Sequence, residues 1–157
     1  DRAATEAVEA GGPVTIRHRV RFSVDRGILW ITLPSGRKLA YMRPRITQNR
    51  FGGKSISYEG MDQRSKRWRR TETYGGKLVE NIVQGIARDC LATAMIRLDE
   101  MGYDIVMHVH DEVILEVPTE QTDALEKACA MMGEPIIWAP GLPLRADGYV
   151  TPYYKKD

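Results

Sequence analysis

The chain of 157 residues is long enough to bury a hydrophobic core of ordinary size. Its two cysteines, Cys90 and Cys129, form no C-x-x-C pair, so neither a zinc site nor a redox motif is indicated. No apolar stretch approaches the length of a membrane span and no signal-like segment opens the sequence, so we expect a cytoplasmic protein with no membrane partner.

The net charge of +2 conceals an uneven distribution of charge. Residues 37–70 contain 11 Lys or Arg against only Glu59 and Asp62, a local charge of +9, whereas the remaining residues carry a net −7. A segregated basic block is a candidate surface for a polyanion such as nucleic acid, although most charged stretches are simply solvated.

The first part of the chain reads as one helix followed by several strands. Residues 2–10 are strong helix formers, and Gly11-Gly12-Pro13 would end that helix abruptly. β-branched residues alternate with polar ones and predict strands in the segments 14–33, 37–42, 57–62 and 68–74. Asp25-Arg26-Gly27 breaks the first segment and suggests a hairpin with a short turn, and the last two segments could pair with each other. Pro44 cannot donate to a strand ladder and is expected to interrupt the second of these, and residues 47–57 read as a loop.

Residues 77–101 carry the clearest helical periodicity. Apolar residues recur at i, i+3, i+4 and i+7, at Val79, Ile82, Val83, Ile86, Cys90, Leu91, Ala94 and Leu98. Cationic and amide side chains form a second stripe, at Lys77, Asn81, Gln84 and Arg88. Such a stripe is usually solvated, but its donors could also reach the minor-groove acceptors N3 and O2 of DNA. Gly85 costs about 1 kcal/mol inside a helix, which favours a function that needs close approach.

Two β-branched runs, 105–109 and 113–117, predict a β-hairpin whose tip carries His110, Asp111 and Glu112. Carboxylates at such a tip face solvent and could bind a hard cation such as Mg²⁺. The alternative is that they are ordinary solvated turn acids.

His108 and His110 form an H-x-H pair expected on one face of a strand, which could bind zinc or another transition metal. Only His18 remains as a third histidine, so a His-rich catalytic site would lack ligands. The sequence also contains no nucleophile elbow and no P-loop, which leaves hydrolase triads and nucleotide-triphosphatase loops unsupported.

The rest of the chain predicts a second helix over residues 119–132, with Thr119 as its N-cap and Gly133 at its end, and a final short strand over 144–150. The expected fold is therefore α+β. An antiparallel sheet with a central hairpin, residues 104–117, packs against a long amphipathic helix, about 76–101, and the second helix.

Together these motifs resemble the C-terminal palm of a family A DNA polymerase, the group that contains bacterial DNA polymerase I and many phage replicases. The segment 109–113, Val-His-Asp-Glu-Val, resembles the third polymerase motif of the family. Residues 36–41 resemble its Gly-Arg-Arg-Leu-Tyr hairpin, 74–81 are closest to phage-type members, and 142–144 resemble its closing strand.

The resemblance implies a role for each matching residue. Asp111 would be a catalytic Mg²⁺ ligand in a two-metal mechanism, Glu112 an auxiliary acid, and His110 a contact to the primer end. Gln84 would probe the minor-groove edge of the terminal base pair. Basic residues that would hold DNA phosphates are Arg37, Lys38, Arg43, Lys66, Arg67, Arg69 and Arg70. The helix residues Lys77, Asn81 and Arg88 would also contact DNA. Family members often place Asn four residues before this Gln, where this chain has Glu80.

The resemblance also implies a single partial domain, a palm fragment that follows the fingers. The first polymerase motif with its metal-binding Asp, the Arg-x-x-x-Lys helix, the fingers and the thumb are absent from residues 1–157. The parent would act on primer–template DNA and dNTP in a bacterial host, and the isolated chain would be inactive and prone to self-association. The alternatives are a non-catalytic basic DNA-binding module and an H-x-H metallohydrolase.

Overall fold

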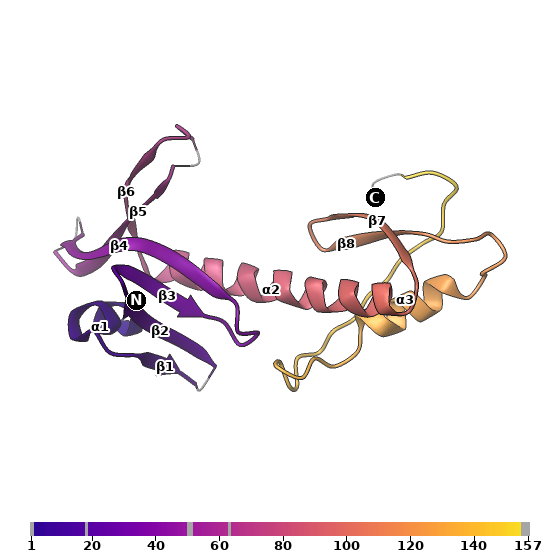
Figure 1. Cartoon of the computed structure of the whole chain (residues 1–157), viewed down its shortest axis with the longest axis horizontal. Coiled ribbons are helices and arrows are strands. Elements are labelled where there is room, and N and C mark those ends of the chain that lie inside the picture. Colours follow the sequence, from indigo (N-terminus) through magenta and orange to yellow (C-terminus); the bar gives the residue numbers. More distant parts are fainter. Residues whose placement is uncertain (1, 18, 50–51, 63, 155–157) are drawn as a thin grey trace. The chain divides into compact units, whose positions relative to one another are not determined.

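The alternating stretches of the first half form one six-stranded antiparallel sheet in which each strand pairs with the next along the chain (Figure 1). Its strands are β1 (Val14–Ile16), β2 (Val20–Asp25), β3 (Ile28–Thr32), β4 (Lys38–Gln48), β5 (Lys54–Met61) and β6 (Trp68–Thr73). This computed structural model describes residues 2–17, 19–49, 52–62 and 64–154. It forms two compact units, of which the first ends at Ile86 and the second begins at Ala87.

Helix α1 (Arg2–Ala10) covers part of this sheet and confirms the helix predicted for residues 2–10. Its small residues Ala4 and Ala7 are fully buried, and in β3 the alternation places Leu29 and Ile31 in the same core. The other buried members of this core are Phe22, Tyr41, Ile56 and Leu78. Burying one side chain of the size of Leu or Ile contributes roughly 1.5–3 kcal/mol, so this cluster is the main source of stability of the first unit.

The turn predicted at Asp25-Arg26-Gly27 is present as a two-residue loop between β2 and β3. Asp25 pairs with Ile28, and the loop residues Arg26 and Gly27 have φ of 49° and 73°. Positive φ at both central positions is typical of a type I′ turn, whose twist matches that of the flanking strands.

Strand β4 is longer than predicted, because Pro44 does not end it. A register shift between Met42 and Arg45 accommodates the proline, Arg43 adopts a φ of 45°, and pairing with β5 resumes at Arg45. The predicted loop over 47–57 is accordingly wrong in extent, since β4 continues to Gln48 and β5 begins at Lys54.

Helix α2 (Gly75–Glu100) confirms the long helix, and Ile82 packs on the core as predicted, but other positions of the predicted apolar face in its first half are wrong. Val79 and Val83 are 57% and 58% exposed, whereas Leu78 and Gly85 are buried. The packed face therefore lies one residue earlier, a rotation of about 100°. Periodicity missed this rotation because a glycine gives no apolar signal. None of the helices among the described residues has the combination of length and apolar character that a membrane-spanning helix needs.

In the second unit a separate two-stranded sheet, β7 (Asp104–Val109) and β8 (Glu112–Glu116), confirms the predicted hairpin. Its inward side chains pack on a core in which Leu98 of α2, Tyr103 just before β7, and Ala124 and Ala128 of the next helix are buried. The α+β fold class is confirmed, although the hairpin pairs with no strand of the larger sheet within the described residues.

Helix α3 (Ala124–Met132) begins later than predicted, and Thr119 is not its N-cap. Residues 118–123 form turns instead, in which the Gln121 amide donates to the Pro118 carbonyl at 3.0 Å, and Asp123 occupies the cap position. Gly133 ends the helix as expected. The strand predicted at 144–150 is wrong, because these residues form no strand.

Candidate functional site

The tip of the β7–β8 hairpin is a two-residue loop made of His110 and Asp111. Val109 pairs with Glu112 across it, and His110 has a φ of 54°. Such tight hairpin loops need positive φ at their first central position, which usually selects glycine. His110, Asp111 and Glu112 are all exposed, and Val113 beside them packs toward the core. The structure thus places the predicted cluster together at a solvent-facing tip.

The tip by itself has too few donor side chains among the described residues to form a metal site. Among the residues that the structure describes, no group of three or more His, Cys, Asp or Glu side chains could hold a metal ion. Asp111 and Glu112 are hard oxygen donors of the kind Mg²⁺ prefers, and an octahedral ion keeps its remaining positions for water or substrate. The two carboxylates are therefore chemically suited to Mg²⁺.

The predicted H-x-H pair does not lie on one face of a strand. His108 is in β7 and pairs with Val113, but His110 belongs to the loop. The Nε2 atom of His108 lies 3.2 Å from an Arg88 guanidinium nitrogen. An arginine donor there uses the lone pair that a metal ion would need, so this geometry gives no support to a zinc site.

A β-bulge in β7 decides which side chains face the core. Pairing shifts between Ile105 and Met107, so Val106 is an extra residue and is 54% exposed. Because of this extra residue, Ile105 and His108 lie on the same side of the hairpin despite their odd spacing. No sequence pattern indicates the bulge, since Val106 has ordinary strand character.

The exposed face of α2 carries a hydrogen-bonded group centred on Glu80. Lys77 Nζ donates to both carboxylate oxygens of Glu80 at 3.0 Å, and Gln84 Nε2 donates to one of them at 3.4 Å. The hydrogen bond to Glu80 raises the pKa of Lys77. Glu80 therefore helps to orient Gln84.

Asn81 turns away from this face. Its Nδ2 atom donates to the Tyr41 hydroxyl at 2.9 Å, in partly buried surroundings, and Tyr41 packs edge-on against Tyr58 with ring centroids 4.9 Å apart. Burial raises the pKa of Tyr41 despite this hydrogen bond. Asn81 thus joins α2 to the sheet, a contact that the stripe pattern did not reveal.

Residues of the β3–β4 turn lie directly against Gly85. The Arg37 guanidinium donates to the Gly85 carbonyl at 2.7 Å, and a Cβ at Gly85 would lie 2.8 Å from Leu33 Cδ1. Leu33 is only 2% exposed and has little room to move. Gly85 therefore lets the β3–β4 turn pack against α2, so the close approach comes from the chain's own residues and not, as the sequence had suggested, from a DNA partner.

Replacing Gly85 by Ala should destabilise the chain by about 1–3 kcal/mol despite the better helix propensity of alanine, because the new methyl group overlaps the buried Leu33 side chain. Urea denaturation measures this change. Gly76→Ala in the same helix is the matched control, since its Cβ would meet only the exposed ring of Tyr74. Equal stability of the two variants would show that Leu33 does not need the glycine.

Arg43 of β4 and Arg69 and Arg70 of β6 form internal ion pairs. Glu59 accepts from Arg70 at 2.9 Å and from Arg43 at 3.2 Å, and Arg70 also donates to the Arg43 carbonyl at 3.0 Å. Burial raises the pKa of Glu59, but the hydrogen bond from Arg70 and the charge of Arg43 outweigh it, and the net shift is downward. Arg69 is paired with Asp62.

The other predicted phosphate contacts are less constrained. Lys38 lies over the Trp30 ring at 5.9 Å, and Lys66 and Arg67 are exposed with no ion pair to any described residue. The predicted basic set is therefore divided between arginines that stabilise the sheet and cations whose charge is open to a partner.

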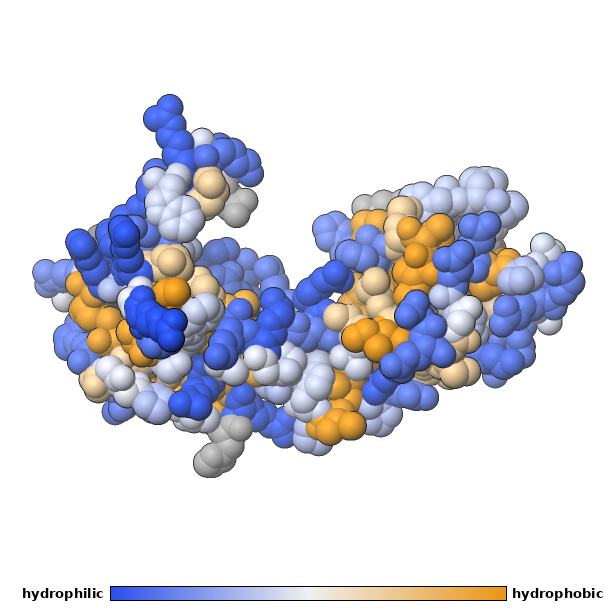
Figure 2. Space-filling view, viewed as in Figure 1, coloured by the Kyte–Doolittle hydropathy of each residue, from blue (hydrophilic) through white to orange (hydrophobic). Residues whose placement is uncertain are grey.

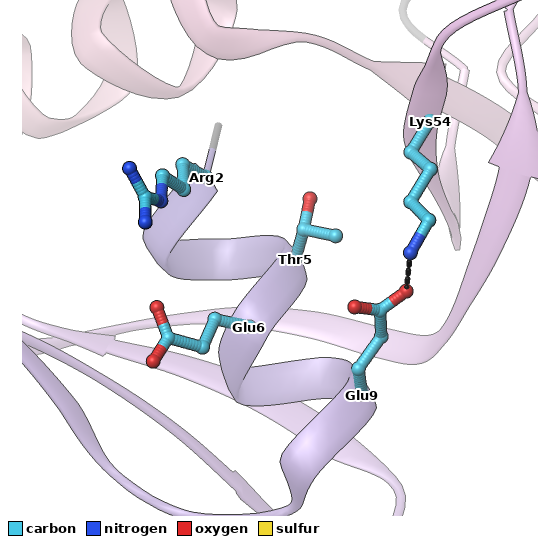
Figure 3. A pocket seen from close by; sticks show the side chains of 5 residues that line it. All are labelled: Arg2, Thr5, Glu6, Glu9 and Lys54. Atoms are coloured by element: carbon cyan, nitrogen blue, oxygen red, sulfur yellow. Dashed lines mark hydrogen bonds and ion pairs between the residues drawn. The ribbon is translucent and has the colours of Figure 1, made fainter.

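Two surface pockets lie away from the predicted site residues. One is lined by Arg2, Thr5, Glu6, Glu9 and Lys54 (Figure 3). There Lys54 Nζ pairs with Glu9 Oε1 at 2.5 Å, which joins α1 to β5. The other is lined by residues of the 101–104 and 116–121 segments in the second unit. Neither contains a hairpin-tip or α2 stripe residue.

Comparison with known proteins gives three relatives. Over its whole length the chain is 54% identical to the DNA polymerase of Bacillus phage SP02, of which it covers 24%. It is 31% identical over 105 residues to the thermostable DNA polymerase I of Thermus aquaticus and 32% identical over 75 residues to DNA polymerase I of Borreliella burgdorferi. These alignments cover 62% and 44% of this chain, and 12% and 8% of the two relatives.

The chain thus spans about a quarter or less of the length of these relatives. No protein-family model and no solved structure matches it.

Proposed function

We propose that this chain, which belongs to the family A DNA polymerases, supplies part of the palm of a template-directed DNA polymerase. The activity would be transfer of a nucleotide from dNTP to a primer 3′ end. The observation that carries the proposal is the similarity to the phage SP02 polymerase along the full length of the chain. Nucleotide incorporation by a polymerase that contains this chain, with and without the Asp111 carboxylate, tests it.

In this function Asp111 and Glu112 would hold Mg²⁺ from the exposed hairpin tip. When bound, the ion would lower the pKa of the primer hydroxyl and offset the charge of the departing pyrophosphate. His110 precedes Asp111 in the same loop and would contact the primer end. The tight loop and the packed strands behind it would keep these three side chains in a fixed arrangement.

The exposed face of α2 would contact the primer–template duplex. Gln84 is held by Glu80 through one N–H and can offer its other N–H to the minor-groove acceptors N3 and O2, which every base pair presents. Lys77 and Arg88 would contact phosphates. Asn81 is less suited to this role because its amide is engaged by Tyr41. Lys38, Lys66 and Arg67 would add contacts that do not depend on sequence.

The isolated 157-residue chain should not extend a primer. Two carboxylates at one hairpin tip give two Mg²⁺ ions too few ligands, and nothing in residues 1–157 resembles the helix that binds the incoming triphosphate in this family. A primer-extension assay with Mg²⁺ and dNTP measures this. Incorporation above the level of a protein-free control would contradict it.

A non-catalytic DNA-binding module is the second candidate, favoured by the exposed cations of the β5–β6 hairpin. It would bind duplex DNA with an affinity that falls steeply with salt and is indifferent to Asp111→Asn. The two candidates therefore differ in the effect of the same substitution. Self-association of the chain stays a prediction.

A further inference from the structure

The far end of the β5–β6 hairpin displays an apolar pair to solvent. Met61 ends β5 and Trp68 begins β6, and the two residues lie directly opposite each other. Directly opposite residues share one face of the ladder, so their side chains are neighbours. They are 54% and 58% exposed. Figure 1 shows this hairpin extending from the rest of the first unit.

The loop that joins these two residues is rich in cations. The loop from Asp62 to Arg67 contains a single acid, whose carboxylate accepts from the Ser65 amide at 2.7 Å and the Ser65 hydroxyl at 2.8 Å. These hydrogen bonds, with the Arg69 ion pair, lower the pKa of Asp62 to about 2. The Asp62 carboxylate therefore stays ionised, and it is engaged by Ser65 and Arg69.

The remaining charge of the loop is positive and open to a partner. Arg64, Lys66 and Arg67 are exposed, and their side chains have no hydrogen-bond or ion-pair partner among the described residues. Lys66 takes a left-handed φ of 53°, which bends the loop back toward β6. In Figure 2 the end of the hairpin is mostly hydrophilic, with a paler area between the blue residues.

We propose that the end of the β5–β6 hairpin binds unpaired nucleotides of a DNA strand, with Trp68 stacked on a base, Met61 beside it, and Arg64, Lys66 and Arg67 on the phosphates. Stacking needs an exposed base face, which a duplex does not offer, so an exposed indole among free cations fits a single strand. The inference rests on the proposed polymerase function, since its single-stranded partner is the template.

The test is equilibrium binding of the 157-residue chain to a fluorescent oligonucleotide of about 12 thymidines and to an abasic strand of equal length. Trp68→Ala should weaken thymidine binding about 5- to 150-fold and leave the abasic strand unaffected, whereas Trp68→Phe should retain most of the affinity. Lys66→Ala should weaken binding to both strands. It should also reduce by about 0.7 the slope of the logarithm of the binding constant against the logarithm of the salt concentration.

Tyr153→Ala is the matched control, because Tyr153 is also an exposed aromatic residue, at 69%, and has no proposed DNA contact. The inference is overturned if the chain binds neither strand, if both strands bind equally, or if Trp68→Ala matches Tyr153→Ala. If the chain binds DNA but does not distinguish the two strands, or if Trp68→Ala has no more effect than Tyr153→Ala, the polymerase proposal is unaffected. That proposal fails separately, if nucleotide incorporation survives without the Asp111 carboxylate.

Discussion

Nucleotide incorporation should fall about a thousandfold or more when Asp111 is replaced by Asn in a polymerase that contains this chain. The amide has nearly the shape of the carboxylate but lacks the charge that holds Mg²⁺, and loss of several kcal/mol of charge stabilisation corresponds to such a factor. The exposed loop needs no new packing, so the fold should be unchanged. Steady-state primer extension with Mg²⁺ gives the measurement.

Glu116→Gln provides the control for this result. Glu116 is an exposed carboxylate on the same strand as Glu112 and on the same side of the hairpin, but it lies at the far end of the ladder, opposite Asp104. It should retain activity within a few fold. If Asp111→Asn and Glu116→Gln behaved alike, Asp111 would have no special role and the binding-module function would be favoured.

Leu29→Ala should destabilise the chain by about 2–5 kcal/mol, because Leu29 is fully buried at the centre of the first core and its truncation leaves a cavity. The free energy of unfolding of the second unit should also fall. Helix α2 is continuous from Gly75 to Glu100 and contributes Leu78 to the first core and Leu98 to the second, so we expect one cooperative transition.

Hydrogen exchange at amides near Ile31 and near Leu98, followed in urea, tests this cooperativity. Val79→Ala is the control, since Val79 is an exposed valine of α2 and its truncation should change the stability by less than about 0.5 kcal/mol. Loss of protection confined to the Ile31 region would mean that the two units unfold independently and that the chain is not a single domain.

Local patterns were sufficient to predict much of the fold. Helix α1, the Arg26-Gly27 turn, the pairing of β5 with β6 and the hairpin carrying Asp111 all follow from features within a few residues of one another. The hairpin tip was found because two β-branched runs bracket three polar residues. Its location could therefore be read from the sequence, although its chemical role rests on the family resemblance.

Other features depend on contacts between distant residues, and the sequence does not reveal them. The buried face of α2 includes Gly85, whose place is set by Leu33 and Arg37 some fifty positions away. Pro118 and Thr119 have the chemistry of a helix start, but turns delay α3 to Ala124. Arg70 is paired because the strand register places it opposite Glu59. A count of charges along the sequence does not contain this register, so it cannot tell a paired arginine from a free one.

The bulge at Val106 has a consequence for how this hairpin can vary in length. Asp104 and Ile105 keep their partners Glu116 and Leu115 while Val106 pairs with none, so removal of this one residue would leave a regular ladder with the same inward side chains. An insertion or deletion elsewhere in β7 would exchange inner and outer positions. Val106 is therefore the place where natural variants of this strand can lose one residue without turning Ile105 outward.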